Sequence, residues 1–417
     1  SYLKCLSLNA QIYILKQIIF KYMKISYITM QFPAPSETFA SSDIQSLNKL
    51  NPELSVYSLK SKHSDYNRMI KDRKLQNISI FTCKVKENIL GLIEIIKSPF
   101  LFISLLFWLI KNDLRKRGHF IRSFALIPAS FYILSQLKKE KPDVVHLFWG
   151  HYPSLVGFLV KRVLKNSKIS MFLGAYDLEY NLNISKDLAK NADFIFTHAK
   201  ANIPQLNKMN IKTDGINVIH RGINIKDLSL VIENIDKKSN QIICAGRFLP
   251  DKGFDKVIDI FSKLHKNINS SNLVLVGYGS AQSDLEKQTI DLKIESNVTF
   301  TGYLSQNDVL KFMVESDIFL FLSSKAGERL PNVVKEAMLA GCICIVSNTP
   351  GIDELIEHGK TGFIIESNNY DLIPNLISSL DEIKKEEIRT NAKEFILKNF
   401  DVELSMKKYI NIWESNE

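Results

Sequence analysis

The stretch SSKAGERLPNVVKEAMLAGCICIVSNT, from Ser323 to Thr349, decides how the rest of the chain is interpreted. Its proline suits the first turn of a helix and Gly341 suits the position just past the end, which predicts a helix over Pro331–Ala340. The run ICIVS that follows is typical of a buried strand. The helix would carry Glu336 on one face and direct its free N–H groups towards the loop that holds Glu328. The stretch therefore predicts a site for an anion with hydroxyl groups on either side.

Short apolar strands alternate with helical patterns on both sides of this stretch, as a parallel α/β sheet demands. In the first half, strands are predicted at Ile25–Thr29, Asn77–Phe81, Val144–Phe148, Lys168–Leu173, Phe194–Thr197 and Asn217–Ile219. In the second half, they are predicted at Ile242–Ala245, Leu273–Val276, Val298–Thr301 and Ile318–Leu322, with helices from Phe254, Gln282 and Gln306 and a helical region over Glu386–Trp413. A chain of 417 residues exceeds one ordinary core, so two Rossmann-like, doubly wound domains are predicted.

The predicted organisation has five parts. The first domain is predicted to begin at Met23, because this residue opens MKISYIT, which is typical of a strand after a natural start. The five parts are residues 1–22, an N-terminal extension that is a candidate for a translated upstream segment or a fragment boundary; an N-terminal domain, 23–222; a polar linker, 223–240; a second domain, 241–395; and a C-terminal helix, 396–417, a candidate for packing back on the first domain.

Charge is divided unevenly along the chain. Up to Arg221 there are 32 Lys and Arg against 15 Asp and Glu, a net +17, whereas the remainder has 22 against 29, a net −7, which gives +10 in total. A basic half suits nucleic acid, an anionic membrane surface or a solvated face. Nucleic acid is not expected, because the cations adjoin an aliphatic run instead of interleaved aromatic side chains.

The five cysteines are scattered, and Cys342 and Cys344 lie inside an apolar strand pattern. This spacing suits neither a zinc site nor a disulfide framework. The sequence thus predicts a reducing, cytoplasmic compartment.

The segment SPFLFISLLFWLIKNDLRKRGHFIRSF is the most unusual of the first half. Its apolar run, Pro99–Ile110, is too short for a membrane-spanning helix, which needs roughly 20 residues. An apolar helix followed by cations suits attachment to an anionic lipid surface; the alternative is a buried helix whose basic end is solvated. The predicted membrane contacts are Trp108, Lys111, Arg115, Lys116 and Arg117.

Polar residues near strand ends supply candidates for the ligand crevice of the first sheet, because ligands of doubly wound sheets bind at the carboxyl ends of strands. The turn PAPSETFA precedes a predicted helix and has a capping pattern. A lone histidine near a strand is more often a packed residue than a catalyst, so the carboxylate Asp177 is preferred. The candidates are Ser36, Glu37, Thr38, His146, His151 and Asp177.

Two cations follow the first strand of the second half, in GRFLPDKGFD, where Arg247 and Lys252 flank a turn. An arginine grips phosphate oxygens through paired donors, and a lysine adds a compact charge. Together with the GYGS turn and the two glutamates of the opening stretch, they predict a site for a nucleoside-diphosphate sugar.

The motifs GRFLPDKGFD, LVGYGS, FTGYLS and GERLPNVVKEAMLAGCICIVSNTPGIDELIEHGKTGFII resemble the retaining GT-B glycosyltransferases of family 4, the glycosyl transferases group 1. PAPSETFA, PDVVHLFWG and NVIHRGIN are similar to the N-terminal domain of branches that build bacterial capsule, exopolysaccharide or lipopolysaccharide. The resemblance implies two Rossmann-like domains facing each other across a cleft. It also implies metal-independent transfer of a hexosyl unit, with retention, to a glycan or lipid-linked glycan acceptor by an enzyme on the inner face of the plasma membrane.

The resemblance also implies roles for individual residues. Arg247 and Lys252 would neutralise the diphosphate, Glu336 would bind the ribose, and Glu328 would hold hydroxyls of the transferred sugar and face its anomeric carbon. No D-x-D motif, which would hold a metal ion, occurs in the chain. Further donor contacts are expected at Gly277, Gly279, Tyr303, Leu330 and Asn332.

Two positions depart from the family pattern. Arg329 stands where glycine is common, and Gly174 stands where many members have a histidine, for which Asp177, His146 or His151 would substitute. A catalytically silent, membrane-associated protein on the same scaffold is therefore an alternative. A nicotinamide oxidoreductase needs G-x-G-x-x-G, and GYGSAQSD supplies only the first two glycines.

Overall fold

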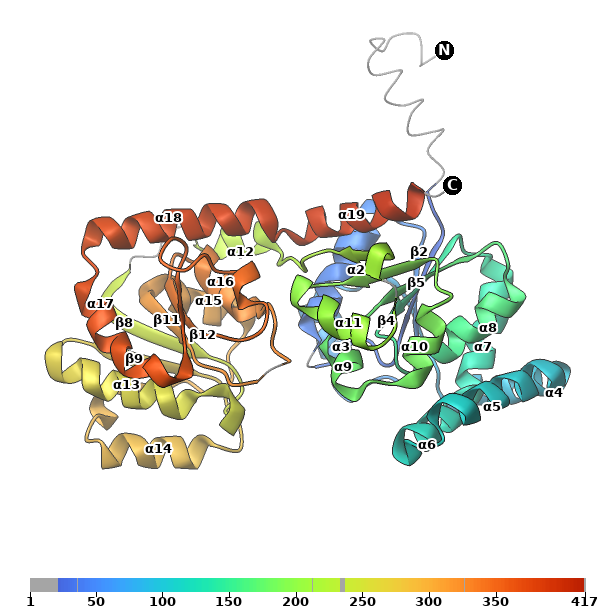
Figure 1. Cartoon of the computed structure of the whole chain (residues 1–417), viewed down its shortest axis with the longest axis horizontal. Helices are drawn as coiled ribbons and strands as arrows, with labels where there is room; N and C mark the ends of the chain where they lie inside the picture. Colours follow the sequence, from blue (N-terminus) through green and yellow to red (C-terminus); the bar gives the residue numbers. More distant parts are fainter. Residues whose placement is uncertain (1–21, 36, 212, 233–236, 326, 416–417) are drawn as a thin grey trace, which may run out of the picture. The chain divides into compact units, whose positions relative to one another are not determined.

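The computed structural model describes residues 22–35, 37–211, 213–232, 237–325 and 327–415. The chain divides into two compact units, one of Ser1–Phe172 with Leu182–Ile195 and one of Leu173–Asn181 with Phe196–Glu417. Two parallel sheets alternate with helices along the chain (Figure 1), which confirms the predicted α/β class. The predicted extension at residues 1–22 lies outside the described residues except for Tyr22, and the predicted domain boundaries stay predictions.

The first sheet has seven strands in the order β3-β2-β1-β4-β5-β6-β7. The strands are β1 Ile25–Thr29, β2 Leu54–Ser58, β3 Ser79–Thr82, β4 Val144–Phe148, β5 Lys168–Phe172, β6 Phe194–Thr197 and β7 Ile216–Val218. Every residue of the central strands β1 and β4 is buried, as expected of parallel strands covered on both faces. Strand β2 is not predicted from the sequence, because the serines of LSVYS interrupt its apolar pattern. One of them, Ser58, is buried and donates to the Lys60 carbonyl.

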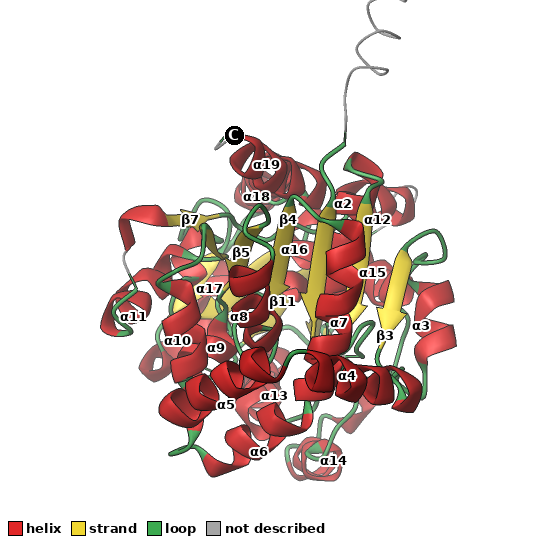
Figure 2. Cartoon of the chain, turned by 90° about the vertical axis from the view of Figure 1, so that its right-hand side faces the viewer, coloured by secondary structure: helices red, strands yellow, loops and turns green. Residues whose placement is uncertain are grey.

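Ten α-helices follow or separate these strands in the described part of the chain up to Lys208. They are α2 Thr38–Leu50, α3 Tyr66–Asp72, α4 Val85–Lys97, α5 Pro99–Asp113, α6 Arg117–Ala125, α7 Ile127–Glu140, α8 Ser154–Val163, α9 Ala175–Tyr180, α10 Asn183–Ala189 and α11 Ile203–Lys208. Four consecutive helices, α4 to α7, connect β3 to β4, and Figure 2 shows α7 running alongside the sheet.

Within the described residues, no single helix has both the length and the apolar character needed to cross a membrane. Two helix pairs pass that test only when taken together: α4 with α5, bent by 105°, and α6 with α7, bent by 46°.

The second sheet has six strands in the order β10-β9-β8-β11-β12-β13. The strands are β8 Lys238–Ala245, β9 Asn272–Val276, β10 Val298–Phe300, β11 Ser316–Phe321, β12 Ile343–Ser347 and β13 Phe363–Ile365. The accompanying helices are α12 Ile225–Ile232, α13 Phe254–Asn267, α14 Gln282–Asp291, α15 Gln306–Glu315, α16 Asn332–Leu339, α17 Ile373–Ser379, α18 Glu382–Asn399 and α19 Val402–Glu414. After β8, the chain adds β9 and β10 on one side of this strand. It then crosses back and adds β11, β12 and β13 on the other side, so the strand order reverses between β8 and β11.

Within the predicted polar linker, residues 223–240, the structure contains α12 and the start of β8. Ile225 and Leu228 of this helix are buried in a core cluster of the second unit. Before it, the Ile223 N–H donates to the Phe400 carbonyl over 2.8 Å, and Ile223 forms a bridge with Asp401. The apolar residues of IKDLSLVI form the buried face of the helix. The polar residues around this segment concealed its helical spacing of apolar residues.

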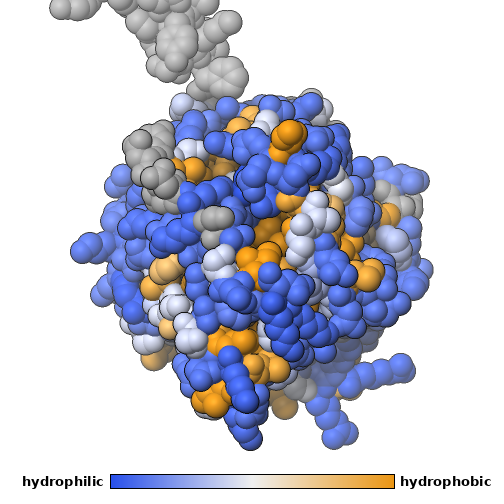
Figure 3. Space-filling model, turned by 90° about the vertical axis from the view of Figure 1, so that its left-hand side faces the viewer, coloured by the Kyte–Doolittle hydropathy of each residue, from blue (hydrophilic) through white to orange (hydrophobic). Residues whose placement is uncertain are grey.

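The C-terminal region forms two helices, α18 and α19, instead of one. The Tyr409 ring of α19 stacks on Phe196 with centroids 4.1 Å apart, and the Trp413 ring meets the same residue edge-on at 6.2 Å. A contact across more than half of the sequence therefore anchors the end of the chain. Figure 3 shows one face of the molecule, which is mainly hydrophilic with small hydrophobic patches.

Candidate functional site

The strand-order reversal of the second sheet places two loops side by side at the carboxyl ends of β8 and β11. In doubly wound sheets this switch point is where ligands bind. The loop after β8 carries Arg247 and Lys252, and the loop after β11 carries Glu328. The Ser324 N–H donates to the Asp251 carbonyl over 3.0 Å, which joins the two loops. The tertiary structure thus brings three predicted site residues to one place.

The loop after β8 turns tightly around a short 3-10 helix, Pro250–Lys252. Phe248 is fully buried and anchors the loop, while Arg247 is exposed. Gly253 has φ +72°, and a Cβ atom there would lie 2.1 Å from the Leu322 carbonyl oxygen. Only glycine fits this position, which lets the loop approach β11 closely enough to bring Lys252 to its end.

Lys252 and Glu328 form an ion pair at the centre of the candidate site. The Lys252 Nζ atom lies 2.6 Å from Glu328 Oε1 and 2.7 Å from Oε2. The Ser323 hydroxyl donates to the same Oε2 atom over 2.7 Å, and the side chains of Lys252 and Glu328 are only 12% and 19% exposed. The carboxylate therefore points into the switch point, where a charged or hydroxyl-bearing ligand would compete for both partners.

The backbone between Glu328 and α16 is held from both sides. The Thr349 hydroxyl donates to the Glu328 carbonyl over 3.3 Å, and the Leu330 side chain packs in a core cluster. Pro331 is the N-cap, with φ −63° and ψ 129°, and the helix starts one residue later than predicted, at Asn332. Among the described residues, no side chain caps α16, so the structure assigns no side-chain acceptor to the first N–H groups of this helix.

Glu336 lies on α16, where Gln306 Nε2 donates to its Oε1 atom over 2.6 Å. Burial raises the pKa of Glu336 to about 7, against the opposing effects of Gln306 and the Lys335 cation. This carboxyl group therefore changes its charge near neutral pH. The sequence analysis did not single out Gln306; its place at the start of a predicted helix gave no hint of a partner on α16.

Lys335, next to Glu336, is fully buried. Its Nζ atom donates to the Arg221 carbonyl over 2.8 Å and to Asn332 Oδ1 over 3.0 Å, and it lies 5.2 Å from the Phe400 ring centroid. It anchors α16 and holds the Asn332 side chain. In the sequence, a lysine next to a glutamate is typical of a solvated surface. The sequence therefore contains no sign that Lys335 anchors α16.

Glycines and tyrosines follow β9 and β10 at the same end of the sheet. A Cβ atom at Gly277 would lie 1.8 Å from the Gly246 carbonyl oxygen, and one at Gly279 would lie 2.3 Å from the Phe248 carbonyl oxygen. These glycines let the loop after β9 pack against the loop after β8. Tyr303, a predicted donor contact, is exposed and meets Tyr278 edge-on at 6.0 Å, so two aromatic faces are available beside the site.

Arg329, which departs from the family pattern, is bound to Asn202. Its Nε atom donates to Asn202 Oδ1 over 2.8 Å. Burial lowers the pKa of Arg329, while Glu179 and Glu354 act in the opposite sense. Glu354 in turn accepts from the Lys200 backbone N–H over 2.8 Å. Arg329 thus joins a hydrogen-bonded cluster around residues 200–202 and 354.

The predicted candidates of the first half are mostly packed residues. His146 is buried, and its Nδ1 atom lies 2.8 Å from the Ser170 hydroxyl; His151 is buried against Tyr152. Asp177 is fully buried, and its carboxylate accepts from the Gly174 N–H over 3.2 Å, which caps α9. The Asp177 carboxylate thus binds a helix N-terminus inside the fold, and its catalytic role stays a prediction.

The turn after β1 lies at the switch point of the first sheet, between β1 and β4. The N-cap of α2 is Glu37, which accepts from Trp149 Nε1 over 3.1 Å, and Thr38 is the first helical residue. Ser36, predicted to end this turn, lies outside the described residues.

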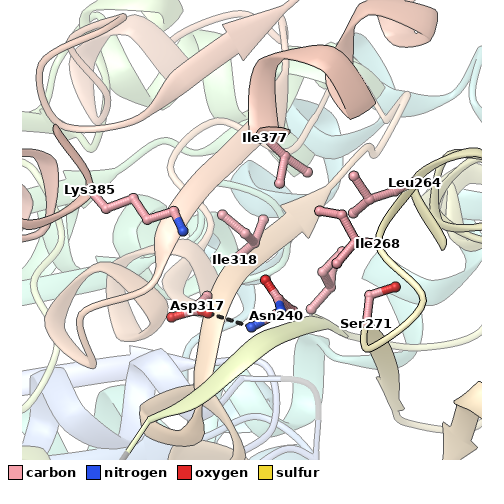
Figure 4. Close-up of a pocket in the computed structure, with 9 residues that line it drawn as sticks. Asn240, Leu264, Ile268, Ser271, Asp317, Ile318, Ile377 and Lys385 are labelled. Atoms are coloured by element: carbon pink, nitrogen blue, oxygen red, sulfur yellow. Dashed lines mark hydrogen bonds between the residues drawn. The ribbon is translucent and has the colours of Figure 1, made fainter. Parts of the chain in front are cut away.

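A small cavity of about 20 Å³ lies at the other end of the second sheet, near the starts of β8 and β11. Figure 4 shows Asn240 and Asp317 joined across its edge, through a backbone N–H and a carboxylate oxygen 2.7 Å apart. Its volume suits about one water molecule. Its position away from the switch point separates it from the candidate site.

Among the described residues, no group of three or more His, Cys, Asp or Glu side chains is arranged to hold a metal ion. The predicted independence from metal stays a prediction.

The two sheets define the class of protein, a two-domain α/β fold of the GT-B kind. The crystal structure of HepE from Anabaena in complex with UDP matches 94% of this chain and 100% of its own, with a TM-score of 0.69 and 17% identity. At this identity, the match establishes the fold.

Sequence comparison adds similarity to one family and to individual glycosyltransferases. Residues 226–395, which contain the whole candidate site, match Glycosyl transferases group 1. The chain is 22% identical over 382 residues to the amylovoran biosynthesis glycosyltransferase AmsK of Erwinia amylovora, covering 86% of this chain and 91% of that protein. It is 27% identical over 293 residues to an uncharacterised glycosyltransferase of Methanocaldococcus jannaschii, covering 68% and 71%. These matches make residues 226–395 similar to the glycosyl transferases group 1, and most of the chain similar to individual glycosyltransferases.

Proposed function

We propose that this protein is a retaining, metal-independent glycosyltransferase that moves a hexosyl unit from a nucleoside-diphosphate sugar to an acceptor hydroxyl. The single observation that carries the proposal is the Lys252–Glu328 pair at the switch point, with Arg247 in the adjoining turn and Glu336 on the helix that follows. The group 1 match over the same residues supports it.

The proposed donor fits the charges and hydroxyl acceptors of the site. A diphosphate needs cations, which Arg247 and Lys252 supply, and sugar hydroxyls need acceptors, which the carboxylates of Glu328 and Glu336 supply. The N-terminus of α16 adds backbone N–H groups and a favourable dipole for an anion. UDP-glucose is the first donor to test, because HepE is also known in complex with UDP-glucose.

In the proposed reaction, the bond between the anomeric carbon and the diphosphate oxygen breaks, and its electron pair goes to that oxygen. A new bond forms from the acceptor oxygen to the anomeric carbon, and the proton of the acceptor hydroxyl is released to the surrounding water. Negative charge develops on the leaving diphosphate, so preorganised cations beside it lower the barrier.

The proposed acceptor is a glycan or lipid-linked glycan in the synthesis of a bacterial surface polysaccharide, in the cytoplasm. The printed role of AmsK in amylovoran biosynthesis supports this class of pathway. Family 4, retention, hexose specificity and the location are parts of the proposal.

Donor binding is the direct test. Isothermal titration calorimetry with UDP, UDP-glucose, GDP and ADP is expected to give saturable binding of one nucleotide class, and a transfer or hydrolysis assay identifies the sugar. Glu336→Ala should weaken nucleotide binding, whereas Lys256→Ala should not, since Lys256 is an exposed residue of α13. Wild-type protein that binds none of a full panel of nucleotide sugars would overturn the proposal; binding without turnover would favour the catalytically silent alternative.

A further inference from the structure

Helix α5 exposes a continuous apolar stripe. Phe100 and Phe107 are 87% and 69% exposed, and Ile103, Ile110 and Leu114 share the same face at spacings of three and four residues. This spacing places the five side chains in one row along the helix. A soluble protein rarely exposes a contiguous apolar area of this kind without a partner.

The opposite face of α5 is firmly seated in the first unit. Leu105 and Leu109 are fully buried, and the Trp108 ring packs on Phe158 with centroids 4.6 Å apart. Trp108 Nε1 donates to Asp187 over 2.7 Å. The predicted membrane contact at Trp108 is therefore wrong, because this residue is only 9% exposed and its indole N–H donates to Asp187 inside the protein. The exposed stripe lies on a different face of α5 from the buried residues. The packing of α5 in the first unit therefore does not require the side chains of the stripe to be apolar.

The neighbouring helices extend this face, and Figures 1 and 2 both show α4, α5 and α6 together along one edge of the first unit. Helix α4 lies against α7 at Gly91, where a Cβ atom would meet the Pro128 carbonyl oxygen at 1.9 Å. The side of α4 that faces away from α7 exposes further apolar side chains, and so does α6. They are Val85, Ile89, Leu90, Leu92, Ile93 and Ile96 of α4 and Ile121 and Phe124 of α6.

A buried polar cluster fixes the corner between α5 and α6. Asp113, at the end of α5, is fully buried and pairs with His119 of α6. The Ser123 hydroxyl lies 3.5 Å from the same carboxylate oxygen, and the His119 ring stacks on Tyr152 with centroids 4.6 Å apart. The two helices are therefore held in one arrangement, and the basic turn between them, residues 114–116, is held with them.

Cations surround the apolar residues and outnumber the acids. Residues 84–122 contain eight Lys and Arg against three Asp and Glu. The three acids are engaged within the protein: Asp113 is buried, Glu94 pairs with Lys97 over 2.8 Å, and Glu87 accepts from the Lys84 backbone N–H. All of these cations except Lys116 are exposed. The face is thus both apolar and positively charged.

We propose that the outward side chains of α4, α5 and α6, here termed the apolar–basic surface, dock on an anionic lipid bilayer. The aromatic and aliphatic side chains enter the boundary between headgroups and acyl chains, and Lys111, Arg115, Lys116 and Arg117 contact the headgroup phosphates. The helices lie on the bilayer, which agrees with the 105° bend between α4 and α5.

Charge favours a bilayer over a second copy of the chain. Two copies joined through this face would bring the same cations together, and like charges across an interface oppose association. An anionic bilayer supplies apolar depth and negative charge at once. This inference goes beyond the proposed function and needs neither donor nor acceptor.

Co-sedimentation with vesicles tests the proposal. The full chain should sediment with vesicles of phosphatidylcholine and phosphatidylglycerol and much less with phosphatidylcholine alone, and added salt should release it. Phe100→Ser with Phe107→Ser, and separately Arg115→Gln with Arg117→Gln, should each weaken the affinity about tenfold or more, since each cation near an anionic surface contributes about a factor of five.

Matched controls separate this surface from general stickiness. Leu230→Ser with Ile383→Ser removes equally exposed apolar side chains of α12 and α18, and Lys256→Gln with Lys287→Gln removes exposed cations of α13 and α14. Both control pairs should bind vesicles like the wild type. Circular dichroism melting verifies that each variant is folded.

Three outcomes would overturn the proposal. They are no preference of the wild type for anionic vesicles, equal loss of binding in a control pair, and light scattering that shows a dimer broken by Phe100→Ser with Phe107→Ser. The last outcome would assign the surface to a contact between copies of the chain.

Discussion

At the scale of single residues, the ion pair between Lys252 and Glu328 is the central feature of the site. In the structure the lysine has a carboxylate partner, and the carboxylate has a second donor in Ser323. Binding of a diphosphate would exchange one anionic partner of Lys252 for another, so the lysine keeps an anionic partner in either state. This arrangement avoids the cost of an isolated charge in a covered site.

The first prediction concerns this lysine. Lys252→Met should reduce kcat/KM about a hundredfold or more, equivalent to about 3 kcal/mol, because the leaving diphosphate loses a preorganised cation. Steady-state transfer assays with the identified donor measure the loss, and Lys256→Met is the control on the neighbouring helix. A Lys252→Met enzyme within a few-fold of wild type would refute the assigned role.

The second prediction concerns pH and Glu336, whose pKa burial raises to about 7. The folded protein holds this proton at pH values where the unfolded chain, with an ordinary glutamate pKa, has released it. Stability from this group is therefore present at low pH and falls as pH rises towards about 7. Glu336→Gln should remove that part of the slope in urea unfolding measured from about pH 5 to about pH 8.

The same ionisation should appear in nucleotide binding. Ribose hydroxyls donate to a carboxylate, so nucleotide affinity should rise as pH increases through about 7 in the wild type and should be flatter in Glu336→Gln. Titration calorimetry across this range measures the difference. A wild-type affinity that falls over the same range would contradict a ribose contact by Glu336.

At the scale of elements, close approach between helices depends on single small residues. Gly91 lets α4 lie directly on α7, and this contact supports the first part of the apolar–basic surface. Gly118 of α6, by contrast, has open space where a Cβ atom would be added. The two glycines form a matched pair inside helices of one unit.

The third prediction compares them. Gly91→Ala should destabilise the protein by about 1–3 kcal/mol, because a backbone carbonyl occupies the place of the new atom and the helices must separate. Gly118→Ala should be neutral or stabilising by up to about 1 kcal/mol, since alanine favours the helix. Urea unfolding monitored by circular dichroism measures both; equal effects would contradict the packing assigned to Gly91.

At the scale of the whole molecule, contacts distant in sequence tie the C-terminus into the fold. Tyr409 and Trp413 of α19 pack on Phe196, and the Ser405 hydroxyl donates to the His220 carbonyl over 2.8 Å. The last helix therefore contributes to stability although it carries none of the candidate site residues.

The fourth prediction follows from that contact. Trp413→Ala should lower the free energy of unfolding by about 3 kcal/mol, the typical cost of removing a large buried aromatic side chain. Nucleotide affinity of the folded variant should stay within a few-fold of wild type. Chemical unfolding and titration calorimetry check the two parts, and exposed Leu404→Ala on the same helix is the control.

The sequence by itself determined the class of fold and most of its strands. Strands such as Ile25–Thr29 and Val144–Phe148 were predicted with their observed bounds, because buried parallel strands read as short, continuous apolar runs. It also determined the loop–helix stretch with Glu328 and Glu336 and the cations that follow β8, since proline, glycine and charged residues mark strand ends and helix starts locally.

Only the tertiary structure decided which of these groups meet and which are packed away. Lys252 and Glu328 are 76 residues apart in the sequence. They meet because the strands before them, β8 and β11, are neighbours in the sheet. Burial decided that Asp177 caps a helix, that Lys335 anchors one, and that Trp108 faces inward while Phe100 and Phe107 face outward. Exposure and long-range pairing arise from packing between elements, which the local pattern of residue types does not encode.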